Sequence, residues 1–487
     1  MKINDFKNKK VTVIGLGLHG GGVGVAKFFS RLGAKVLVTD LRNKEDLKES
    51  LEQLKGESIK YVLNQHRPED FINTDLVIRN PAVPDRSKYL EIAREHKVPI
   101  ETDIGIFFEL CPASIIGVTG SKGKSTVATL IAKFLAKEHN KVFLAGNIRS
   151  SVLQKLNKIN KESLVVLELS SWQLAGLRPH RQSPHCAVFT NILPDHLNRY
   201  KSINEYIEDK KEIFRWQKSK DYLILNYDDK IVRNFAQGVK SQVFYYSQDN
   251  GLTSNLEKEK LGAFVRGEKI FMASPVEPLL DQDPASLSDG KKEEICSLDD
   301  ISLRGKHNID NVLAAVTVAK LYQVSNKSIK KVLNKFKSLE GRLELVKIIN
   351  GVKYINDTTA TIPEASLAAL NSFPSNKHII LIAGGNDKNL DFSQLVEMVN
   401  KKVKKIIFLE GTATPKFKKA LEDQIELTDN QLKVIGPLSS MEQAVAEAEK
   451  EAKEKDIVLL SPAATSFGLF RHEFERGEAF VKAVNDL

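Results

Sequence analysis

The chain has 487 residues, of which 42% are hydrophobic, and it carries a formal net charge of +10. Its length predicts about three domains, and its hydrophobic content is sufficient for sizeable cores. No apolar run approaches the roughly 18–20 residues of a membrane span, and the first ten residues, MKINDFKNKK, lack the apolar stretch of a signal peptide. We therefore expect a cytoplasmic protein that does not bind membranes.

The positive charge allows two interpretations. A basic chain can bind nucleic acid, but the lysines here are mixed with glutamates in predicted helices, as in residues 447–451, and no basic stripe is interleaved with aromatic residues. We favour solvated helix surfaces and anionic small-molecule substrates, with no nucleic-acid partner. The cysteines lack metal or redox spacing, as expected of reduced thiols: Cys111, Cys186 and Cys296.

The first predicted domain alternates strands and helices. Residues 11–14 predict a strand and residues 23–32 an amphipathic helix, with a G-x-G-x-x-G turn beginning at Gly15 between them. Asp40 ends the next predicted strand, about twenty residues on, which is typical of a dinucleotide-binding fingerprint. We favour a nucleotide or diphosphate ligand at this helix start. NAD fits less well, because glycines at 20–22 make the turn loose, and a tight turn without a ligand is the structural alternative. A further strand is predicted at residues 75–78, before Asn80-Pro81.

The second predicted domain begins with the most informative stretch, Thr119–Thr126, which reads TGSKGKST. It lies between apolar residues 114–118 and a predicted helix at 127–135. Strand, glycine-rich loop and helix in this order predict a phosphate-binding loop, because backbone N–H groups and the helix dipole attract anions. Lys124 would reach the outer phosphates and Ser125 would offer a hydroxyl to Mg²⁺. The spacing is a shortened Walker A pattern, since a valine stands where its first glycine would be.

Polar residues follow two of the next apolar strands. These strands are predicted at residues 141–145, 164–168, 186–190 and 222–225. Glu168 ends one of them, where ligands of α/β folds gather, and beside a phosphate loop a carboxylate is suited to hold Mg²⁺. Asp195 and His196 follow another strand and share the same expected sheet edge. A metal or substrate role for His196 and a purely structural one remain equally open from the pattern.

Beyond this region the pattern becomes irregular from residue 242 to 302. A hairpin is predicted at 263–272, and the polar stretch 274–300 indicates a long surface insertion. Helices are predicted at 308–321 and 327–335, the first of them preceded by the polar string RGKHN and bearing Asn311.

The third predicted domain begins with a hairpin signal, in which Asn350-Gly351 separates apolar residues 343–349 from 352–355. The later strands are predicted at residues 379–383, 405–409, 433–435 and 457–460. Their alternation with helices argues for a parallel sheet covered by helices. Polar loops follow three strands, at residues 356–361, 384–388 and 461–467, and suggest one ligand-binding face.

Taken together, these strings resemble those of the Mur ligases, the ATP-dependent amide-forming enzymes of peptidoglycan assembly. The matching strings are VTVIGLGLHG, TGSKGKST, AGNI, LELSSWQL, TNILPDHLNRY, GKHNIDN, NDTTAT, GGNDK and LLSPAATSF. They span nearly the whole chain. The resemblance is strongest to the branch that adds D-glutamate to UDP-N-acetylmuramoyl-L-alanine. Folylpolyglutamate synthetases share the central loop but lack a first domain for UDP.

The resemblance implies an α/β fold of three domains. It implies a Rossmann-like UDP-substrate-binding domain at 1–110, a P-loop ATPase-like ATP-binding domain at 111–337 and a Rossmann-like amino-acid-binding domain at 338–487. We expect a monomer that uses ATP, Mg²⁺ and small-molecule substrates. ATP would phosphorylate the alanine carboxylate, and the glutamate amine would attack the resulting acyl phosphate.

The resemblance also implies roles for individual residues. The UDP-substrate would contact Leu18, His19, Asp40, Arg42, Asn80 and Asn147. ATP would contact Gly120, Ser121, Lys122, Gly123, Lys124, Ser125, Thr126, Asn311, Arg342 and Asp357. Mg²⁺ would be held by Ser125, Glu168, His196 and, if it is carbamylated, Lys210. The amino acid would contact Thr361, Lys388, Ser466 and Phe474. The catalytic residues would be Lys124, Glu168, His196 and Lys210.

One departure from the family pattern concerns the amino acid. The D-glutamate-adding branch carries a lysine where this chain has Thr359. L-Glutamate or another amino acid is therefore the alternative substrate, as in other Mur or folylpolyglutamate ligases. A NAD-dependent oxidoreductase built on the first glycine turn is the remote alternative, and it leaves the central phosphate loop without a purpose.

Overall fold

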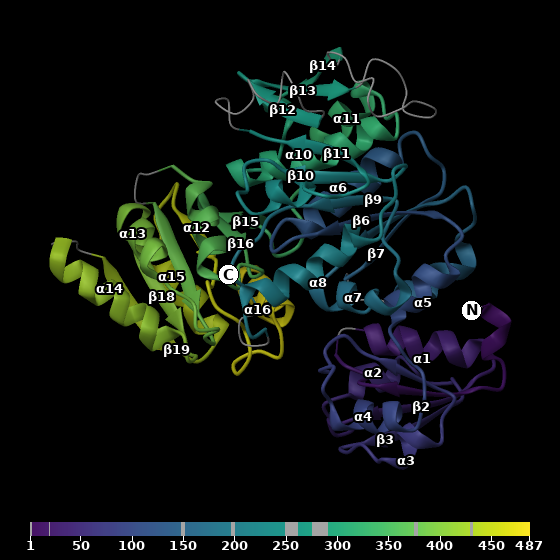
Figure 1. Cartoon of the computed structure of the whole chain (residues 1–487). Coiled ribbons are helices and arrows are strands. Elements are labelled where there is room, and N and C mark those ends of the chain that lie inside the picture. Colours follow the sequence, from purple (N-terminus) through teal and green to yellow (C-terminus); the bar gives the residue numbers. More distant parts are fainter. Residues whose placement is uncertain are drawn as a thin grey trace. The chain divides into compact units, whose positions relative to one another are not determined.

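The computed structural model describes residues 2–18, 20–147, 151–195, 200–248, 262–274, 291–374, 378–428 and 432–487. The chain forms two compact units (Figure 1), and each is described by itself. Unit 1 comprises Met1–Ile192, Asn204–Ile295 and Val312–Ile329, and unit 2 comprises Leu193–Ile203, Cys296–Asn311 and Lys330–Leu487. None of the helices in these described ranges has the length and apolar character that a bilayer span needs.

The first sheet of unit 1 is parallel, with the strand order β3-β2-β1-β4-β5 in the described residues. Its strands are β1 (Lys10–Ile14), β2 (Lys35–Asp40), β3 (Ile59–Leu63), β4 (Leu76–Arg79) and β5 (Ile100–Glu101). The three predicted strands and the helix α1 (Gly21–Arg31) are confirmed, whereas β3 and β5 were not predicted. The chain passes from β1 to β2 on one side and later to β4 on the other. The crevice between β1 and β4 is therefore the switch point where open α/β sheets bind ligands.

The central sheet of unit 1 is also parallel, and its described strands have the order β11-β10-β9-β6-β8-β7. They are β6 (Ser114–Thr119), β7 (Val142–Gly146), β8 (Leu164–Glu168), β9 (Cys186–Phe189), β10 (Tyr222–Asn226) and β11 (Gln242–Tyr246). The predicted helix after the phosphate loop is α6 (Lys124–Leu135). Because β6 lies between β8 and β9, the loops that follow these three strands are neighbours at one edge of the sheet.

The region predicted to be irregular is more regular than its sequence indicates. β11 is an ordinary strand, and a small sheet of β12 (Gly262–Arg266), β13 (Lys269–Ser274) and β14 (Lys291–Ser297) follows. The predicted hairpin is confirmed, with Ala263 opposite Met272. The expected insertion at 274–300 is wrong for its last ten residues, which form β14 and a 3₁₀ turn at Leu298–Asp300. This strand reads as polar because, among residues 292–297, only Ile295 and Cys296 are buried. Residues 275–290 lie outside the described ranges.

The sheet of unit 2 has the order β15-β16-β20-β17-β18-β19 in the residues described. Its strands are β15 (Glu344–Ile349), β16 (Val352–Asn356), β17 (Ile379–Gly384), β18 (Val403–Leu409), β19 (Lys433–Leu438) and β20 (Ile457–Leu460). The predicted hairpin is the antiparallel pair β15 and β16, and the remaining pairs are parallel. Helices α10 (Lys306–Leu321) and α11 (Asn326–Leu333) are confirmed as well. The α/β architecture, with two parallel sheets and a third that is parallel except for its β15–β16 hairpin, matches the expected fold class.

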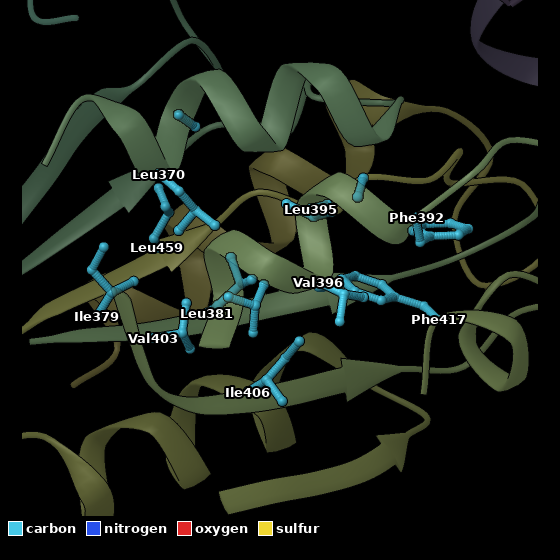
Figure 2. Close-up of a cluster of buried hydrophobic side chains, with 14 of the residues drawn as sticks. Leu370, Ile379, Leu381, Phe392, Leu395, Val396, Val403, Ile406, Phe417 and Leu459 are labelled. Carbon is cyan, nitrogen blue, oxygen red and sulfur yellow. The ribbon is translucent and has the colours of Figure 1, made fainter. Parts of the chain in front are cut away.

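Hydrophobic residues cover both faces of the unit 2 sheet, which explains why its central strands are continuous apolar runs rather than alternating ones. On one face, helices α12 (Pro363–Asn371), α13 (Ser393–Lys402) and α14 (Thr414–Thr428) contribute to a buried cluster. Figure 2 shows Leu370, Leu395 and Val396 of this cluster beside the strand residue Leu381. On the other face pack α15 (Met441–Glu451) and α16 (Glu473–Asn485). The sheet is therefore a rigid platform for the loops at its carboxyl edge.

His180 ties the central part of unit 1 to the segment that leaves the first sheet. Its Nε2 lies 2.8 Å from Glu101 Oε2 in β5, and its Nδ1 lies 3.2 Å from Glu109 Oε1 in α5 (Asp103–Leu110). The imidazole is 6% exposed. The hydrogen bond to Glu101, and then the second carboxylate, raise the pKa of His180 above its ordinary value.

This arrangement predicts a pH-dependent contribution to stability. Because the folded-state pKa of His180 is raised, its two bonds contribute fully below the unfolded pKa of about 6.5 and are lost as pH rises through the folded pKa. The free energy of unfolding of His180→Gln should fall below that of the wild type by about 1 kcal/mol at pH 5.5 to 6, and the gap should narrow toward pH 8.5. Urea unfolding across this pH range measures it. A gap that stays constant with pH would contradict the prediction.

Candidate functional site

The phosphate loop joins β6 to α6, and two glycines set its shape. Gly123 caps α6 with a φ of +88°, and Gly120 has a φ of +142°. A Cβ atom on Gly120 would lie 1.8 Å from Thr190 Oγ1, so no larger residue fits there. The loop therefore passes tightly against β9 and leads into the start of α6, and the N-terminus of a helix attracts anions.

Two lysines converge on the same carbonyl oxygen of this loop. Lys124 Nζ donates to Gly120 O at 3.1 Å and to Ser121 O at 3.0 Å, and Lys210 Nζ donates to Gly120 O at 2.9 Å. Lys210 is buried, with 1% of its surface exposed. Two ammonium groups beside a helix N-terminus concentrate positive charge, which is the electrostatic setting that phosphate groups require.

The loop after β9 fixes the phosphate loop from the other side. The N–H of Ser121 donates to Asn191 O and the N–H of Lys122 to Asn191 Oδ1, both at 2.9 Å. The hydroxyl of Thr190 donates to the carbonyl of Lys122 at 2.6 Å. Neither Thr190 nor Asn191 was predicted to have a role, although both stand at the expected strand end. The phosphate loop is thus held by backbone and side-chain bonds before any ligand binds.

Tyr206 is a second residue that the sequence did not reveal. Its hydroxyl lies 3.0 Å from Ser121 Oγ, and its ring centroid lies 4.6 Å from Lys210 Nζ. Both Tyr206 and Lys210 belong to α8 (Ile203–Arg215), one helical turn apart, so they share one helix face. The four-residue spacing of Tyr206 and Lys210 is the sequence feature that could have indicated this contact. The ring stabilises the ammonium group by a cation–π contact and orients it toward the loop.

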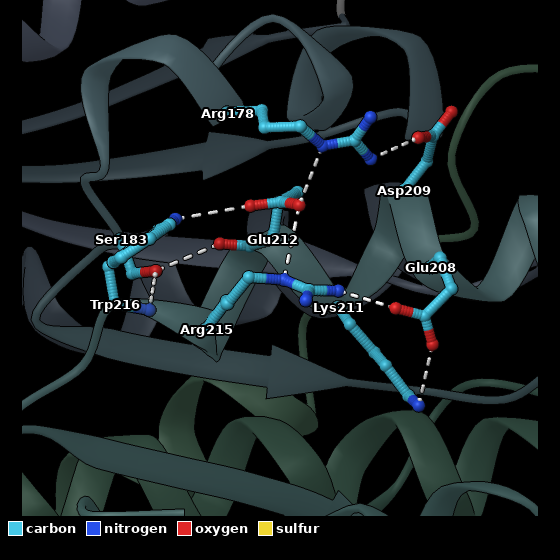
Figure 3. A network of polar contacts seen from close by, with 8 residues as sticks. All are labelled: Arg178, Ser183, Glu208, Asp209, Lys211, Glu212, Arg215 and Trp216. Carbon is cyan, nitrogen blue, oxygen red and sulfur yellow. Dashed lines mark hydrogen bonds and ion pairs between the residues drawn. The ribbon is translucent and has the colours of Figure 1, made fainter.

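A polar network holds the opposite face of α8 (Figure 3). Arg178 donates to Glu212 Oε1 at 3.0 Å and to Asp209 Oδ1 at 2.8 Å, and Arg215 contacts the same Glu212 oxygen at 3.1 Å. Ser183 Oγ donates to the carbonyl of Glu212 at 2.8 Å. Glu212 is 1% exposed, and a buried carboxylate held by two guanidinium groups is a strong positional constraint. The network therefore fixes the helix that presents Lys210.

Glu168 lies at the end of β8, and one of its two carboxylate oxygens accepts a hydrogen bond. Oε1 accepts from Asn147 Nδ2 at 3.2 Å, whereas Oε2 is buried without a hydrogen-bond partner among the described atoms. An oxygen of this kind suits a hard divalent cation. Ser125, half-buried at the start of α6, offers a hydroxyl at the adjacent strand end. No group of three His, Cys, Asp or Glu side chains forms a metal cluster in the described ranges, and His196 lies outside them.

The first glycine turn is held open by Asp40. Its carboxylate accepts from the N–H groups of Leu16 at 2.8 Å and Gly17 at 3.2 Å, and Asn80 Nδ2 donates to Gly15 O at 3.1 Å. Asp40 is 3% exposed, so it shapes the turn from within. The other expected substrate residues of this unit are placed as follows: Leu18 half-buried in the turn, Arg42 half-exposed beside Asp40, Asn147 exposed after β7, and His19 outside the described residues.

In unit 2, the three predicted polar loops follow neighbouring strands, because β20 lies between β16 and β17. Asp357 is buried and accepts from the N–H of Leu343 at 3.1 Å and from the hydroxyl of Ser461 at 2.8 Å. The hydroxyl of Thr359, at the position of the family lysine, donates to Gly341 O at 2.9 Å. Thr359 thus ties down the loop but brings no positive charge.

Arg476 fastens two of these loops and was not predicted. From α16 it donates to Thr358 Oγ1 at 3.1 Å, to Thr358 O at 2.8 Å and to Ala464 O at 3.1 Å. Its side chain is fully buried, and loss of solvent lowers the pKa of Arg476 to about 9. A Cβ on Gly385, in the third loop, would lie 3.4 Å from Arg476 Nη1. One guanidinium therefore lies behind all three loops.

The expected amino-acid residues lie around the same sheet edge. Lys388 Nζ donates to Asp195 Oδ1 at 2.9 Å, and both side chains are at most 10% exposed. Ser466 Oγ is buried and has no partner among the described atoms. Thr361 is half-buried after β16, and Phe474 is half-buried in the first turn of α16.

The residues expected to bind ATP belong to both units. The loop residues 120–126 lie in unit 1, whereas Asn311, Arg342 and Asp357 lie in unit 2. Asn311 Nδ2 donates to Asn308 Oδ1 at 2.9 Å, and Arg342 is half-buried in the turn before β15. Each of these two sets of residues is described within its own unit.

Three family models match successive parts of the chain. They are the MurD-like amino-terminal domain of Mur ligases at residues 9–102, the Mur ligase middle domain at 118–319 and the Mur ligase glutamate ligase domain at 341–464.

Relatives match over the full length. The chain is 42% identical to a UDP-N-acetylmuramoylalanine–D-glutamate ligase of Roseiflexus sp. (strain RS-1) over 98% of both chains. It is 39% identical to the same-named protein of Acetivibrio thermocellus over 100% of this chain and 99% of the relative. Among solved structures, UDP-N-acetylmuramate–alanine ligase MurC from Thermotoga maritima shares the fold with a TM-score of 0.61 and 17% identity, over 98% of this chain and 99% of that one.

The position of Arg476 predicts its contribution to stability. Arg476→Met removes three hydrogen bonds and leaves two buried carbonyl oxygens without donors, which should lower the free energy of unfolding by about 2–4 kcal/mol. Arg476→Lys keeps one donor group and should lower the free energy of unfolding by less. The matched control is Arg471→Met, because Arg471 lies in the same segment but is 54% exposed. Chemical unfolding of the three variants measures this, and equal effects at 471 and 476 would contradict the role of Arg476 in holding the loops together.

Proposed function

The chain belongs to the Mur ligase family, and we propose that it is an ATP-dependent ligase that joins D-glutamate to UDP-N-acetylmuramoyl-L-alanine in peptidoglycan precursor synthesis. The proposal is supported by one observation above all. Lys124 and Lys210 converge on the carbonyl of Gly120, within a chain that matches D-glutamate-adding relatives from end to end. A loop of this geometry binds a nucleoside triphosphate, and the relatives indicate what the triphosphate is used for.

The roles divide along the chain. We assign the UDP-substrate to residues 1–110, where the first glycine turn lies at the switch point of its sheet. We assign ATP to residues 111–337 and the amino acid to residues 338–487, whose three polar loops share one sheet edge. The protein would act in the cytoplasm, where ATP and the nucleotide-linked substrate are available.

ATP is bound, in this proposal, by the phosphate loop. Residues 120–126 would cradle the phosphates through backbone N–H groups, and the ammonium group of Lys124 would leave the carbonyls of the loop for the outer phosphates. The resemblance to the family also assigns Asn311, Arg342 and Asp357 of unit 2 to ATP. The bonds from Thr190 and Asn191 keep the loop in shape, so little reorganisation is needed when the phosphates bind.

Mg²⁺ fits the residues present, because Glu168 offers a buried carboxylate oxygen without a partner. Ser125 and Glu168 would hold it, together with His196 and Lys210 if the latter is carbamylated. When bound, it neutralises charge on the phosphate oxygens. Tyr206 and the network around Glu212 keep Lys210 at the loop, which is the condition for Lys210 to take part.

The reaction itself needs positioning more than covalent catalysis by the protein. The alanine carboxylate attacks the terminal phosphorus of ATP, ADP leaves, and an acyl phosphate forms. The glutamate amine then attacks the acyl carbon, loses a proton, and phosphate departs with the bonding electrons as the amide forms. Lys124 binds the phosphate oxygens throughout, and holding the two reactants in place supplies most of the rate enhancement.

The amino-acid site would lie at the three loops of unit 2. Lys388 supplies a cation, Ser466 a buried hydroxyl, and Thr361 and Phe474 line the same edge. Thr359 cannot replace the charge of the family lysine, so Lys388 carries more of the recognition of glutamate here. D-Glutamate is the substrate supported by the relatives, and L-glutamate is the alternative that the assay must separate.

A turnover assay tests the whole proposal. With ATP, Mg²⁺ and UDP-N-acetylmuramoyl-L-alanine, phosphate release should depend on D-glutamate, and Lys124→Ala should lower kcat by about 10²–10³-fold. L-Glutamate and other amino acids are supplied one at a time. No release with any amino acid would refute the ligase, whereas release with L-glutamate alone would keep the mechanism and change the substrate.

A paired substitution tests the role of Lys210. Lys210→Ala should reduce kcat by at least about 100-fold while the enzyme stays folded, because a buried group at the phosphates is removed. Lys211→Ala, one residue along on the same helix, removes a lysine that is 31% exposed and paired with Glu208, and should change kcat less than about twofold. Equal activity of the two variants would remove Lys210 from the mechanism.

A further inference from the structure

The segment that supports the phosphate loop is itself held by side chains from the next two strands. Thr190 and Asn191 bind the phosphate loop, and residues 190–192 are called the bracing segment below. In the central sheet, β10 lies beside β9 on the side away from β6, and β11 lies beyond β10. The proposed mechanism gives no task to the residues at the carboxyl ends of β10 and β11, yet these residues contact the bracing segment.

Two buried donors meet at the carbonyl oxygen of Thr190. Asn226 ends β10 and donates from Nδ2 at 3.0 Å. The hydroxyl of Tyr246, which ends β11, lies 3.1 Å from the same oxygen, closer than the 3.4 Å to the carbonyl of Phe189. Asn226 is 6% exposed and Tyr246 is 1% exposed. Since the N–H of Thr190 donates to Thr119 O at 2.9 Å, both backbone polar groups of Thr190 are fixed.

Asp229 fixes the other end of the bracing segment. Its Oδ2 accepts from the N–H of Ile192 at 2.9 Å. Its Oδ1 accepts from the N–H groups of Ile231 at 2.9 Å and Val232 at 3.0 Å. Both carboxylate oxygens are therefore occupied by backbone donors, and Asp229 joins the bracing segment to the turn that follows β10.

The bracing segment transmits its position directly to the phosphate loop. Asn191 binds both peptide groups of Lys122, because its Oδ1 accepts from the N–H at 2.9 Å and its Nδ2 donates to the carbonyl at 3.1 Å. Thr190 Oγ1 donates to the same carbonyl at 2.6 Å and lies tightly against Gly120. A displaced bracing segment would thus displace the loop, and a misplacement of about 1 Å can cost about 100-fold in rate.

We propose that Asn226, Tyr246 and Asp229 are positioning residues for the phosphate loop, and that they act on it through residues 190–192. They hold the loop in the shape that receives phosphate groups before any nucleotide binds, which lowers the cost of binding. The inference rests on the proposed function for the nucleotide that the loop receives. None of the three residues belongs to the strings that carry the family resemblance.

Two neighbouring aspartates provide a matched comparison. In Asp229→Asn an NH₂ group must face a backbone N–H, because both oxygens of Asp229 accept from such donors. Asp228 accepts from the Ser247 hydroxyl and, at 2.9 Å, from the N–H of Gln248. Since a hydroxyl can also accept, Asp228→Asn keeps two hydrogen bonds with its amide. The two variants remove the same charge at adjacent positions, so charge alone cannot separate them.

Nucleotide binding to the full-length protein tests the aspartates without turnover. ADP with Mg²⁺ and UDP-N-acetylmuramoyl-L-alanine are titrated calorimetrically in separate experiments, and chemical unfolding of each variant is measured alongside. Asp229→Asn should weaken ADP by about five- to thirty-fold, as expected when a backbone donor loses its acceptor, and leave the UDP-substrate within about twofold. Asp228→Asn should bind both ligands within about twofold of the wild type.

A pair of tyrosines tests the contact at Thr190 in the same way. Tyr246→Phe removes one of the two donors and should weaken ADP by about two- to five-fold. Combined with Asn226→Ala it removes both donors, so the loss should exceed the product of the two single losses. Tyr245→Phe is the control, because the Tyr245 hydroxyl lies 3.3 Å from the carbonyl of Arg233 and should leave ADP binding unchanged.

The other outcomes overturn the proposal. Unchanged ADP affinity in Asp229→Asn and Tyr246→Phe, or equal losses for ADP and the UDP-substrate, means that these residues support the fold alone. Equal effects of Asp228→Asn and Asp229→Asn would reduce the result to a change of charge. If Asp229→Asn does not fold, Tyr246→Phe and its control decide. A wild type that binds ADP but joins no amino acid would refute the proposed reaction and leave the roles of these three residues to stand or fall by ADP affinity.

Discussion

The central part of unit 1 depends on the contact of two lysines with one carbonyl oxygen. Lys124 comes from the helix that follows the loop, and Lys210 comes from a helix more than eighty residues later, yet both meet at Gly120. Placing a second cation there is electrostatically unfavourable, and the structure offsets this with the ring of Tyr206 and with carbonyl acceptors. The ion-pair network on the far side of α8 keeps that helix in position. An anion at the loop relieves the repulsion, which is why this arrangement suits phosphate.

The same principle of sheet order organises both units. Parallel strands direct all their following loops to one edge, and only neighbouring strands bring their loops into contact. In the central sheet the order β9-β6-β8 joins the phosphate loop to Glu168 and Asn191. In unit 2 the order β16-β20-β17 joins three loops that are far apart in the sequence. Arg476 then donates hydrogen bonds to two of them and lies close to the third, so these loops are shaped by a fully buried side chain.

The sequence was sufficient for much of the fold and for the residue types of the site. Buried strands such as residues 379–383 are apolar throughout, so their position could be predicted, and glycines with a fixed geometric need marked the phosphate loop. It was not sufficient where one face of a strand is solvated, as in β14, whose lysines and glutamates resemble a loop. Nor could it reveal Arg476 or Tyr206, because their roles depend on contacts between distant segments. An arginine near the end of the chain looks like any surface cation until its burial is known.

The pairing of Lys388 with Asp195 has a consequence for which molecules unit 2 can select. A cation already paired with a buried carboxylate offers less to a simple anion, because the anion must compete with that carboxylate for the ammonium group. A zwitterion avoids this penalty, because its negative end can take Lys388 while its protonated amine takes Asp195. If the amino acid binds here as proposed, this pair of opposite charges would discriminate against dicarboxylates of the same length that lack nitrogen, before any chemical step begins.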